Sequence, residues 1–187
     1  DLRGMLDALR LMRRGVAAGA ALDMGITNKA FDSYEQGLIR DAIAARILAQ
    51  LGYGEHDQEL ARIAGFMHDI GNVVNRHDHA QTGAVMAFRI LDKMGMEPAD
   101  VAAVITAIGH HDDPTAFPVN PVAAALILAD KTDVRRSRVR NKEHQSFDIH
   151  DRVNYSVKKA QLKINEEHTL IKLKLSVDTR YGSVMDY

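Results

Sequence analysis

The chain has 187 residues, of which 46% are hydrophobic and 26% charged, a composition typical of one globular domain with or without an appendage. Its 24 Lys and Arg against 25 Asp and Glu give a net charge of −1, so the composition as a whole does not point to nucleic acid or an anionic membrane as a partner. The absence of cysteine excludes disulfides, thiolate metal sites and a cysteine nucleophile.

The hydropathy pattern gives an expectation for the compartment. No apolar run approaches the ~20 residues that cross a bilayer. The first residues lack the apolar core of a signal peptide. We therefore expect a soluble, cytoplasmic protein with no membrane partner.

Helical periodicity runs through the first two thirds of the chain. Apolar residues recur at steps of three and four within 1–24, 38–51, 60–70, 79–94, 98–109 and 122–129. Glycine follows or ends several of these segments and proline opens two, as is typical of helix ends and first turns: Gly52, Gly71, Gly95, Gly109, Pro98 and Pro121. The sequence therefore predicts a mainly α fold.

After about residue 150 the period of the apolar residues changes to two. They alternate with polar residues over 160–164 and 171–177, and Asn165–His168 lies between the two runs. This pattern predicts a C-terminal antiparallel β-hairpin with one wet face. Because an isolated hairpin is marginal in water, we expect the apolar side of 171–177 to pack on the helices or on a second subunit. The predicted domains are a helical domain at 1–145 and a hairpin appendage at 146–187.

Five of the nine histidines fall within 44 residues: His68, His77, His79, His110 and His111. Histidine is the commonest metal ligand in proteins, although for any one of them a solvated surface position is the simpler interpretation. His68 and Asp69 follow an apolar helical stretch, and Asp130 follows another. A carboxylate in such surroundings is costly unless it is paired or bound to a metal. Asp130 taken alone could equally cap a helix or pair with Arg135 or Arg136.

In chain order, Phe66–Gly71, His79, His110-His111 and Leu128–Asp130 resemble the motifs of the HD superfamily of metal-dependent phosphohydrolases. The likeness covers roughly residues 30–135. The flanking stretches 72–76, 130–138 and 147–155 resemble a bacterial branch of that family with a C-terminal hairpin. In the HD family a helical bundle presents a first His, an adjacent His-Asp pair and a distal Asp to a divalent metal, so the resemblance implies an HD-type helical bundle.

The resemblance also implies a set of site residues. The metal ligands would be His68, Asp69 and Asp130 at one ion, and Asp69, His79, His110 and His111 at a second. The catalytic positions would be Asp69, Asn72 and Lys131. Apart from the resemblance, the cations that could neutralise phosphate oxygens are Arg76, Lys131, Arg135, Arg136 and Arg138. The cofactor would be one or two divalent ions, and the sequence does not distinguish Mn, Fe, Mg, Zn and Ni. His77 is the weaker candidate and fits a solvated loop.

The chain departs from the family pattern at three places. Gln36 stands where the first His is expected, and its amide oxygen is a poorer ligand for Mn or Fe than imidazole. Asn72 replaces a Lys that often follows the His-Asp pair. The residues after His111 do not match the cyclic-di-GMP phosphodiesterases of the superfamily, so we do not expect that activity.

The chemistry expected from these residues is hydrolysis of a nucleotide-like phosphoester. Because the sequence has no evident Ser–His–Asp arrangement or phosphate-cradling glycine loop, a metal-bound hydroxide is the expected nucleophile. The basic run 135–142 would be a solvated helix end or a phosphate site. Two alternatives stay open: a non-catalytic HD module that binds metal or nucleotide in a sensing role, and a structural domain that dimerises through the hairpin. The expected partner is thus a small phosphorylated molecule, with a homodimer left open and nucleic acid not expected.

Overall fold

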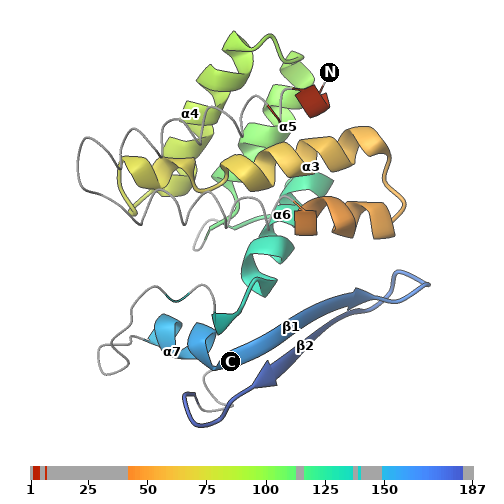
Figure 1. Cartoon of the computed structure of the whole chain (residues 1–187). Coiled ribbons are helices and arrows are strands. Elements are labelled where there is room, and N and C mark those ends of the chain that lie inside the picture. The colour runs from red at the N-terminus through yellow and green to blue at the C-terminus, as the bar shows by residue number, and fades with distance from the viewer. Residues whose placement is uncertain are drawn as a thin grey trace. The chain divides into compact units, whose positions relative to one another are not determined.

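The computed structural model describes residues 2–4, 7, 42–112, 116–136, 139 and 149–182. Its internal contacts divide the chain into two compact units, Asp1–Asp130 and Lys131–Tyr187. The described part of the first unit is helical, and the second unit carries a two-stranded antiparallel sheet (Figure 1). This confirms the mainly α fold with a C-terminal hairpin. Gln36 and the predicted domain boundary at residue 145 lie outside the described residues.

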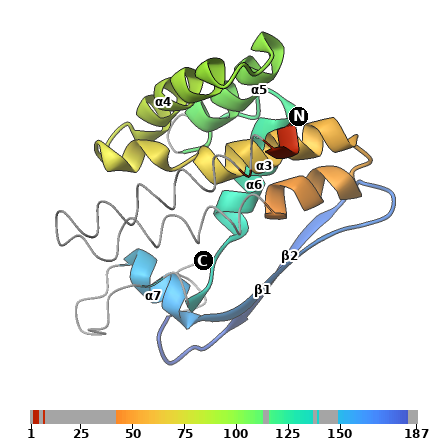
Figure 2. The same cartoon turned by 45° about the horizontal axis from the view of Figure 1, so that its top comes forward.

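The described part of the first unit contains helical residues at 2–4 and 7 and then a helical segment at 42–50. It is followed by α3 (Glu55–Met67), the short 3₁₀ helix η1 (Ile70–Val73), α4 (His79–Lys93), α5 (Pro98–Gly109) and α6 (Pro121–Thr132), whose last two residues belong to the second unit. Helix α5 packs against both α3 and α4, and η1 packs on α4 (Figure 2). None of the helices that the structure describes is long and apolar enough to cross a membrane.

Alanine dominates the core of the first unit. Fully buried alanines occur in the segment 42–50 and in α3, α4, α5 and α6: Ala44, Ala45, Ala61, Ala64, Ala80, Ala87, Ala107, Ala123, Ala125 and Ala129. Such small side chains allow helix backbones to approach closely, while Phe66, Leu91 and Leu126 fill the remaining space. The bundle is therefore a close-packed frame for residues at the ends of its helices.

Asn120 ties α6 to α5. Its Oδ1 accepts a hydrogen bond from the Ala123 backbone N–H (2.7 Å), which makes Asn120 the N-cap of α6. Its Nδ2 donates to the Thr106 Oγ1 (3.0 Å) and to the Ala103 carbonyl (3.2 Å) on α5. The start of α6 is thereby fixed against the middle of α5.

A glycine contact brings η1 against the start of α4. A Cβ atom built on Gly71 would overlap the His79 carbonyl oxygen and lie 2.7 Å from the backbone nitrogen of Gly83. Only glycine leaves room for this approach of two backbones. The contact places Asp69, which precedes η1, beside the first residue of α4.

The second unit contains α7 (Ile149–Ser156), β1 (Val157–Ile164) and β2 (Ile171–Val177). The strands pair from Ile164↔Ile171 at the turn to Val157↔Val177, with an irregularity between Val157 and Lys159. Asn165 closes the turn, because its Oδ1 accepts hydrogen bonds from the backbone N–H groups of Thr169 and Leu170. Helix α7 had no counterpart among the predicted elements.

The apolar side of β2 is only partly covered. Ile171 and Leu173 are 43% and 39% exposed, whereas Leu175 and Val177 are half-buried. The prediction that this side packs on the helices or on a second subunit stays a prediction.

We predict that Gly71→Ala lowers the free energy of unfolding of the first unit by about 1–3 kcal/mol, because two backbones must separate to admit the methyl group. Gly109→Ala is the matched control, since a Cβ at that position meets only the Ala84 Cβ at an ordinary 3.6 Å. Thermal unfolding of both variants checks this. Equal melting temperatures would show that the contact between η1 and α4 is looser than described.

Candidate metal centre

The predicted metal ligands come from the ends of five helical elements. His68 follows the last residue of α3 and Asp69 precedes η1. His79 is the first residue of α4, and His111 lies two residues beyond the end of α5. Asp130 lies in α6. The motifs that are separated along the chain therefore lie at helix ends in the fold.

Asp69 lies between two imidazoles. Its Oδ2 is 3.2 Å from the Nε2 of His68, and its Oδ1 is 3.3 Å from the Nε2 of His79. The Oδ1 of Asp130 is 4.0 Å from the same nitrogen of His68. The His111 ring stands edge-on to both other rings, with centroids 5.0 Å from His68 and 5.2 Å from His79. Ligand atoms of His68, Asp69 and His111 all lie within 4.8 Å of one another.

Each of the three buried histidines makes the same kind of hydrogen bond to the backbone. In each, Nδ1 lies within hydrogen-bond distance of the carbonyl three residues earlier: His68 to Gly65 (2.7 Å), His79 to Arg76 (3.0 Å) and His111 to Ile108 (2.7 Å). Because a carbonyl oxygen can only accept, Nδ1 carries a proton, and Nε2 keeps its lone pair in the neutral form of the ring. This is the tautomer and the support that metal-binding histidines use.

The contacts of Asp69 favour a positive charge in the site. Where Nδ1 carries the only ring proton, the Nε2 atoms of His68 and His79 present lone pairs to the carboxylate oxygens and cannot donate to them. The hydrogen bond to Asp69 accordingly raises the pKa of His79, against the opposing effect of burial, since an added proton would relieve the conflict. A divalent metal ion would remove the repulsion between the carboxylate oxygens and the lone pairs of both histidines. The donor set of imidazole and carboxylate therefore fits a transition-metal ion.

His111 differs from His79 in its electrostatics. Burial, together with the neighbouring His68, lowers the pKa of His111 to about 4. Its imidazole is therefore neutral near pH 7 and can offer a lone pair without first losing a proton.

Asn72 supports Asp69. Its Nδ2 donates a 2.9 Å hydrogen bond to the Asp69 Oδ1. Its own Oδ1 is buried and has no hydrogen-bond partner among the described residues. A buried acceptor without a partner is costly, so this oxygen suits a water molecule or a ligand in the site.

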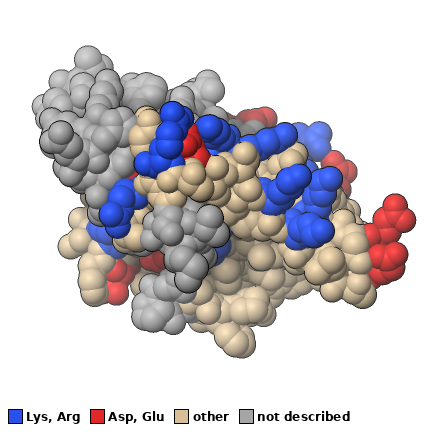
Figure 3. All heavy atoms as spheres, turned by 90° about the horizontal axis from the view of Figure 1, so that it is seen from below, with Lys and Arg blue, Asp and Glu red and all other residues tan. Residues whose placement is uncertain are grey.

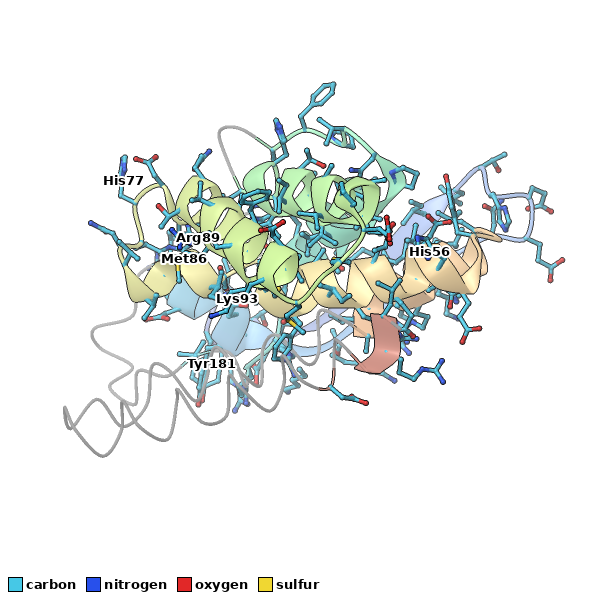
Figure 4. The ribbon with its side chains drawn as sticks, turned by 90° about the horizontal axis from the view of Figure 1, so that it is seen from above. His56, His77, Met86, Arg89, Lys93 and Tyr181 are labelled. Atoms are coloured by element: carbon cyan, nitrogen blue, oxygen red, sulfur yellow. The ribbon has the colours of Figure 1, made fainter. Side chains whose placement is uncertain are left out.

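The structure does not bring all the predicted site residues together. His110 is half-buried at the C-cap of α5 and does not belong to the close group of ligand atoms, so its role at a second ion stays a prediction. His77 is exposed, pairs with Asp78 and points away from the helices, as expected of a loop histidine (Figure 4). Arg76 is exposed three residues before His79.

The remaining predicted phosphate ligands belong to the second unit: Lys131, Arg135 and Arg136, with Arg138 outside the described residues. Arg135 pairs with Asp133 at 2.6 Å. Arg136 donates to the Tyr155 carbonyl at 2.6 Å and stacks over the ring of that tyrosine. These contacts are structural within the second unit, and a role for the three residues in binding phosphate stays a prediction.

Sequence reasoning missed Asp112. Its Oδ2 lies 3.6 Å from the Nδ1 of His79, within the range of a charge interaction. In the sequence, Asp112 was read only as part of a departure from one branch of the family. The signal that could have found it is a carboxylate directly after a His-His pair at a helix end.

The family comparison agrees with this geometry. The model of the HD domain matches residues 42–135, just over half of the chain and the segment that holds all the predicted metal ligands. The chain belongs to the HD domain family.

The chain is also similar to two curated proteins named Ribonuclease Y, from Thermus thermophilus and Deinococcus radiodurans. Each is 34% identical over 113 residues, which covers 56% of this chain and 18% of the relative. The chain therefore matches less than a fifth of the length of these relatives. No solved structure shows a significant match to the chain.

We predict that His68→Ala and Asp69→Ala each abolish metal binding, because each removes an atom from the centre of the site. Metal analysis of the purified variants, followed by Mn²⁺ titration, checks this. His77→Ala is the matched control and should keep the wild-type stoichiometry. Unchanged metal content in either site variant would contradict the assignment.

Proposed function

We propose that the protein is a metal-dependent phosphohydrolase that cleaves a nucleotide-like phosphoester. The observation that carries this proposal is the arrangement of His68, His79 and His111, each held by a backbone carbonyl, around the carboxylate of Asp69. Membership of the HD family supports it. The substrate class rests on the chemistry of the site and on the relatives.

In such a reaction, some residues would bind the metal and others would orient the ligands. His68, Asp69, His79, His111 and Asp130 would hold the metal. A divalent ion, when bound, lowers the pKa of a water molecule and neutralises charge on phosphate oxygens. The backbone carbonyls keep the three imidazoles oriented, and Asn72 keeps the Asp69 carboxylate oriented.

Two further groups would act on the substrate side. The unpartnered Oδ1 of Asn72 can accept a hydrogen bond from a water molecule and so orient its lone pairs. Arg76, exposed close in sequence to His79, can neutralise a phosphate oxygen with a guanidinium that stays charged at every working pH.

The relatives favour a diester between nucleotides as the bond that is cleaved. Both carry the name of a ribonuclease, and the matched part of each relative corresponds to 56% of this chain. We therefore extend the proposal from nucleotides to short oligoribonucleotides.

A non-catalytic, metal-binding HD module is the second candidate. Gln36 at the expected first-His position and Asn72 at the expected Lys position favour it, because each removes a group that the resemblance assigns to the active site. The two candidates differ in turnover and agree in metal binding.

The test is hydrolysis of bis(p-nitrophenyl) phosphate and of a panel of nucleotides and dinucleotides in Mn²⁺. We expect turnover by the wild-type protein and by His77→Ala, and none above background in Asp69→Ala. Stoichiometric metal binding with no turnover of any of these substrates would reject the hydrolase and leave the sensing module.

A further inference from the structure

The net charge of the whole chain conceals opposite charges on its two units. Residues 131–187 contain 13 Lys and Arg and 8 Asp and Glu, a net charge of +5. Residues 1–130 contain 11 Lys and Arg and 17 Asp and Glu, a net charge of −6. Such asymmetry between parts of a chain indicates a polyanionic partner for the basic part.

The strands of the hairpin concentrate this positive charge. Together they contain five lysines and no acidic residue. The register places four of them on one side of the sheet, where the remaining positions are Gln161 and Ser176. We call this side the lysine face; its lysines, all exposed, are Lys159, Lys163, Lys172 and Lys174. The fifth, Lys158, lies next to the irregularity in the register and pairs with Asp178 at 3.1 Å.

Folding of the hairpin gives no reason for this face. Lys163 and Lys172 lie directly opposite each other, and like charges in that position destabilise a strand pair. None of the four lysines has an ion-pair partner among the residues that the structure describes. Figure 3 shows groups of Lys and Arg side chains on the side of the molecule that is seen from below. A bound polyanion would satisfy these charges.

The opposite side of the sheet favours a nucleic acid over an anionic membrane as the ligand. It is apolar, with Ala160, Leu162 and Ile164 opposite Leu175, Leu173 and Ile171. A ribbon that lies on a membrane buries its apolar side in the lipid, and the lysines here would then point away from the anionic headgroups. The lysine face therefore suits a ligand that carries its own regularly spaced charges, as a nucleic acid does.

The composition of the face sets the mode of binding. It contains no aromatic residue for stacking on bases, so it can contact the phosphate backbone without reading sequence. From Lys159 to Lys163 the strand rises about 13 Å, so the face is long enough to contact more than one phosphate of a nucleic-acid chain.

We propose that the lysine face binds the phosphate backbone of single-stranded RNA. The choice of RNA rests on the proposed function, whereas the choice of a polyphosphate backbone rests on the face itself. The hairpin would then bind the substrate chain independently of the residues that cleave it.

Fluorescence anisotropy with a labelled oligo(U) tests the proposal, in EDTA so that no metal-dependent cleavage takes place. The wild-type protein should bind, with an affinity that falls steeply as KCl rises from about 50 to 200 mM. Lys163→Thr/Lys172→Thr should weaken binding at least about tenfold and reduce the log–log salt slope by about 1.4, because two phosphate contacts on a single strand are lost. Its melting temperature should not fall, since a repulsive pair is replaced by two strand-favouring residues.

Arg89→Ser/Lys93→Ser is the control. It removes the same charge from two exposed positions on α4 in the first unit (Figure 4) and should leave RNA binding within about twofold of the wild type, if the contact is local rather than a net-charge effect. Equal losses in both double variants, absence of RNA binding by the wild type, or binding to anionic vesicles but not to RNA would each overturn the proposal. Because EDTA removes the metal, the result is independent of whether the protein hydrolyses bis(p-nitrophenyl) phosphate.

Discussion

The hydrogen bond from a histidine Nδ1–H to a backbone carbonyl three residues earlier is the constraint on which the site depends. The last carbonyls of a helix have no partner within the helix. At the ends of α3 and α5, His68 and His111 use such carbonyls, those of Gly65 and Ile108. One bond thus completes the helix end and directs Nε2 into the site. The position of each histidine just beyond its helix is therefore a chemical requirement.

Asp69 converts this set of nitrogens into a cation site. Its carboxylate faces two lone pairs at 3.2 and 3.3 Å, an arrangement that is stable only with a positive charge between them. The close approach of Gly71 to α4 fixes that separation, and the alanine-rich core holds the helices that carry the ligands. A change in helix packing would therefore alter metal binding even where no ligand is touched.

The sequence predicted the helices α3 to α6, because their periodicity is local. Motif order put His68, Asp69, His79, His111 and Asp130 among the predicted ligands, and their binding of a metal stays a prediction. The sequence did not reveal the contact of Asp112 with His79, because that contact requires the end of α5 to meet the start of α4. Helix α7 was missed because a helix of eight residues presents too few turns for its periodicity to emerge.

The cover of the hairpin and the distribution of charge could not be predicted, because the first depends on packing and the second is hidden in the net charge of the whole chain. Alternation predicted a hairpin with two unlike sides, but it could not tell how far the apolar side is covered at Ile171 and Leu173. The net charge of −1 averaged a basic and an acidic unit, and the register was needed to collect four lysines on one face. Gln36 lies outside the described residues. Metal titration would measure its effect on metal affinity.

The tautomers of the three histidines test the account most directly. Long-range ¹H–¹⁵N correlation spectra of the metal-free and Zn²⁺-loaded protein report which ring nitrogen of each histidine carries the proton. We expect Nδ1 to be protonated in His68, His79 and His111 in both states, with the Nε2 resonances moving on addition of Zn²⁺. A histidine whose Nδ1 carries no proton, or Nε2 resonances that do not respond to Zn²⁺, would contradict a metal centre built on these three residues.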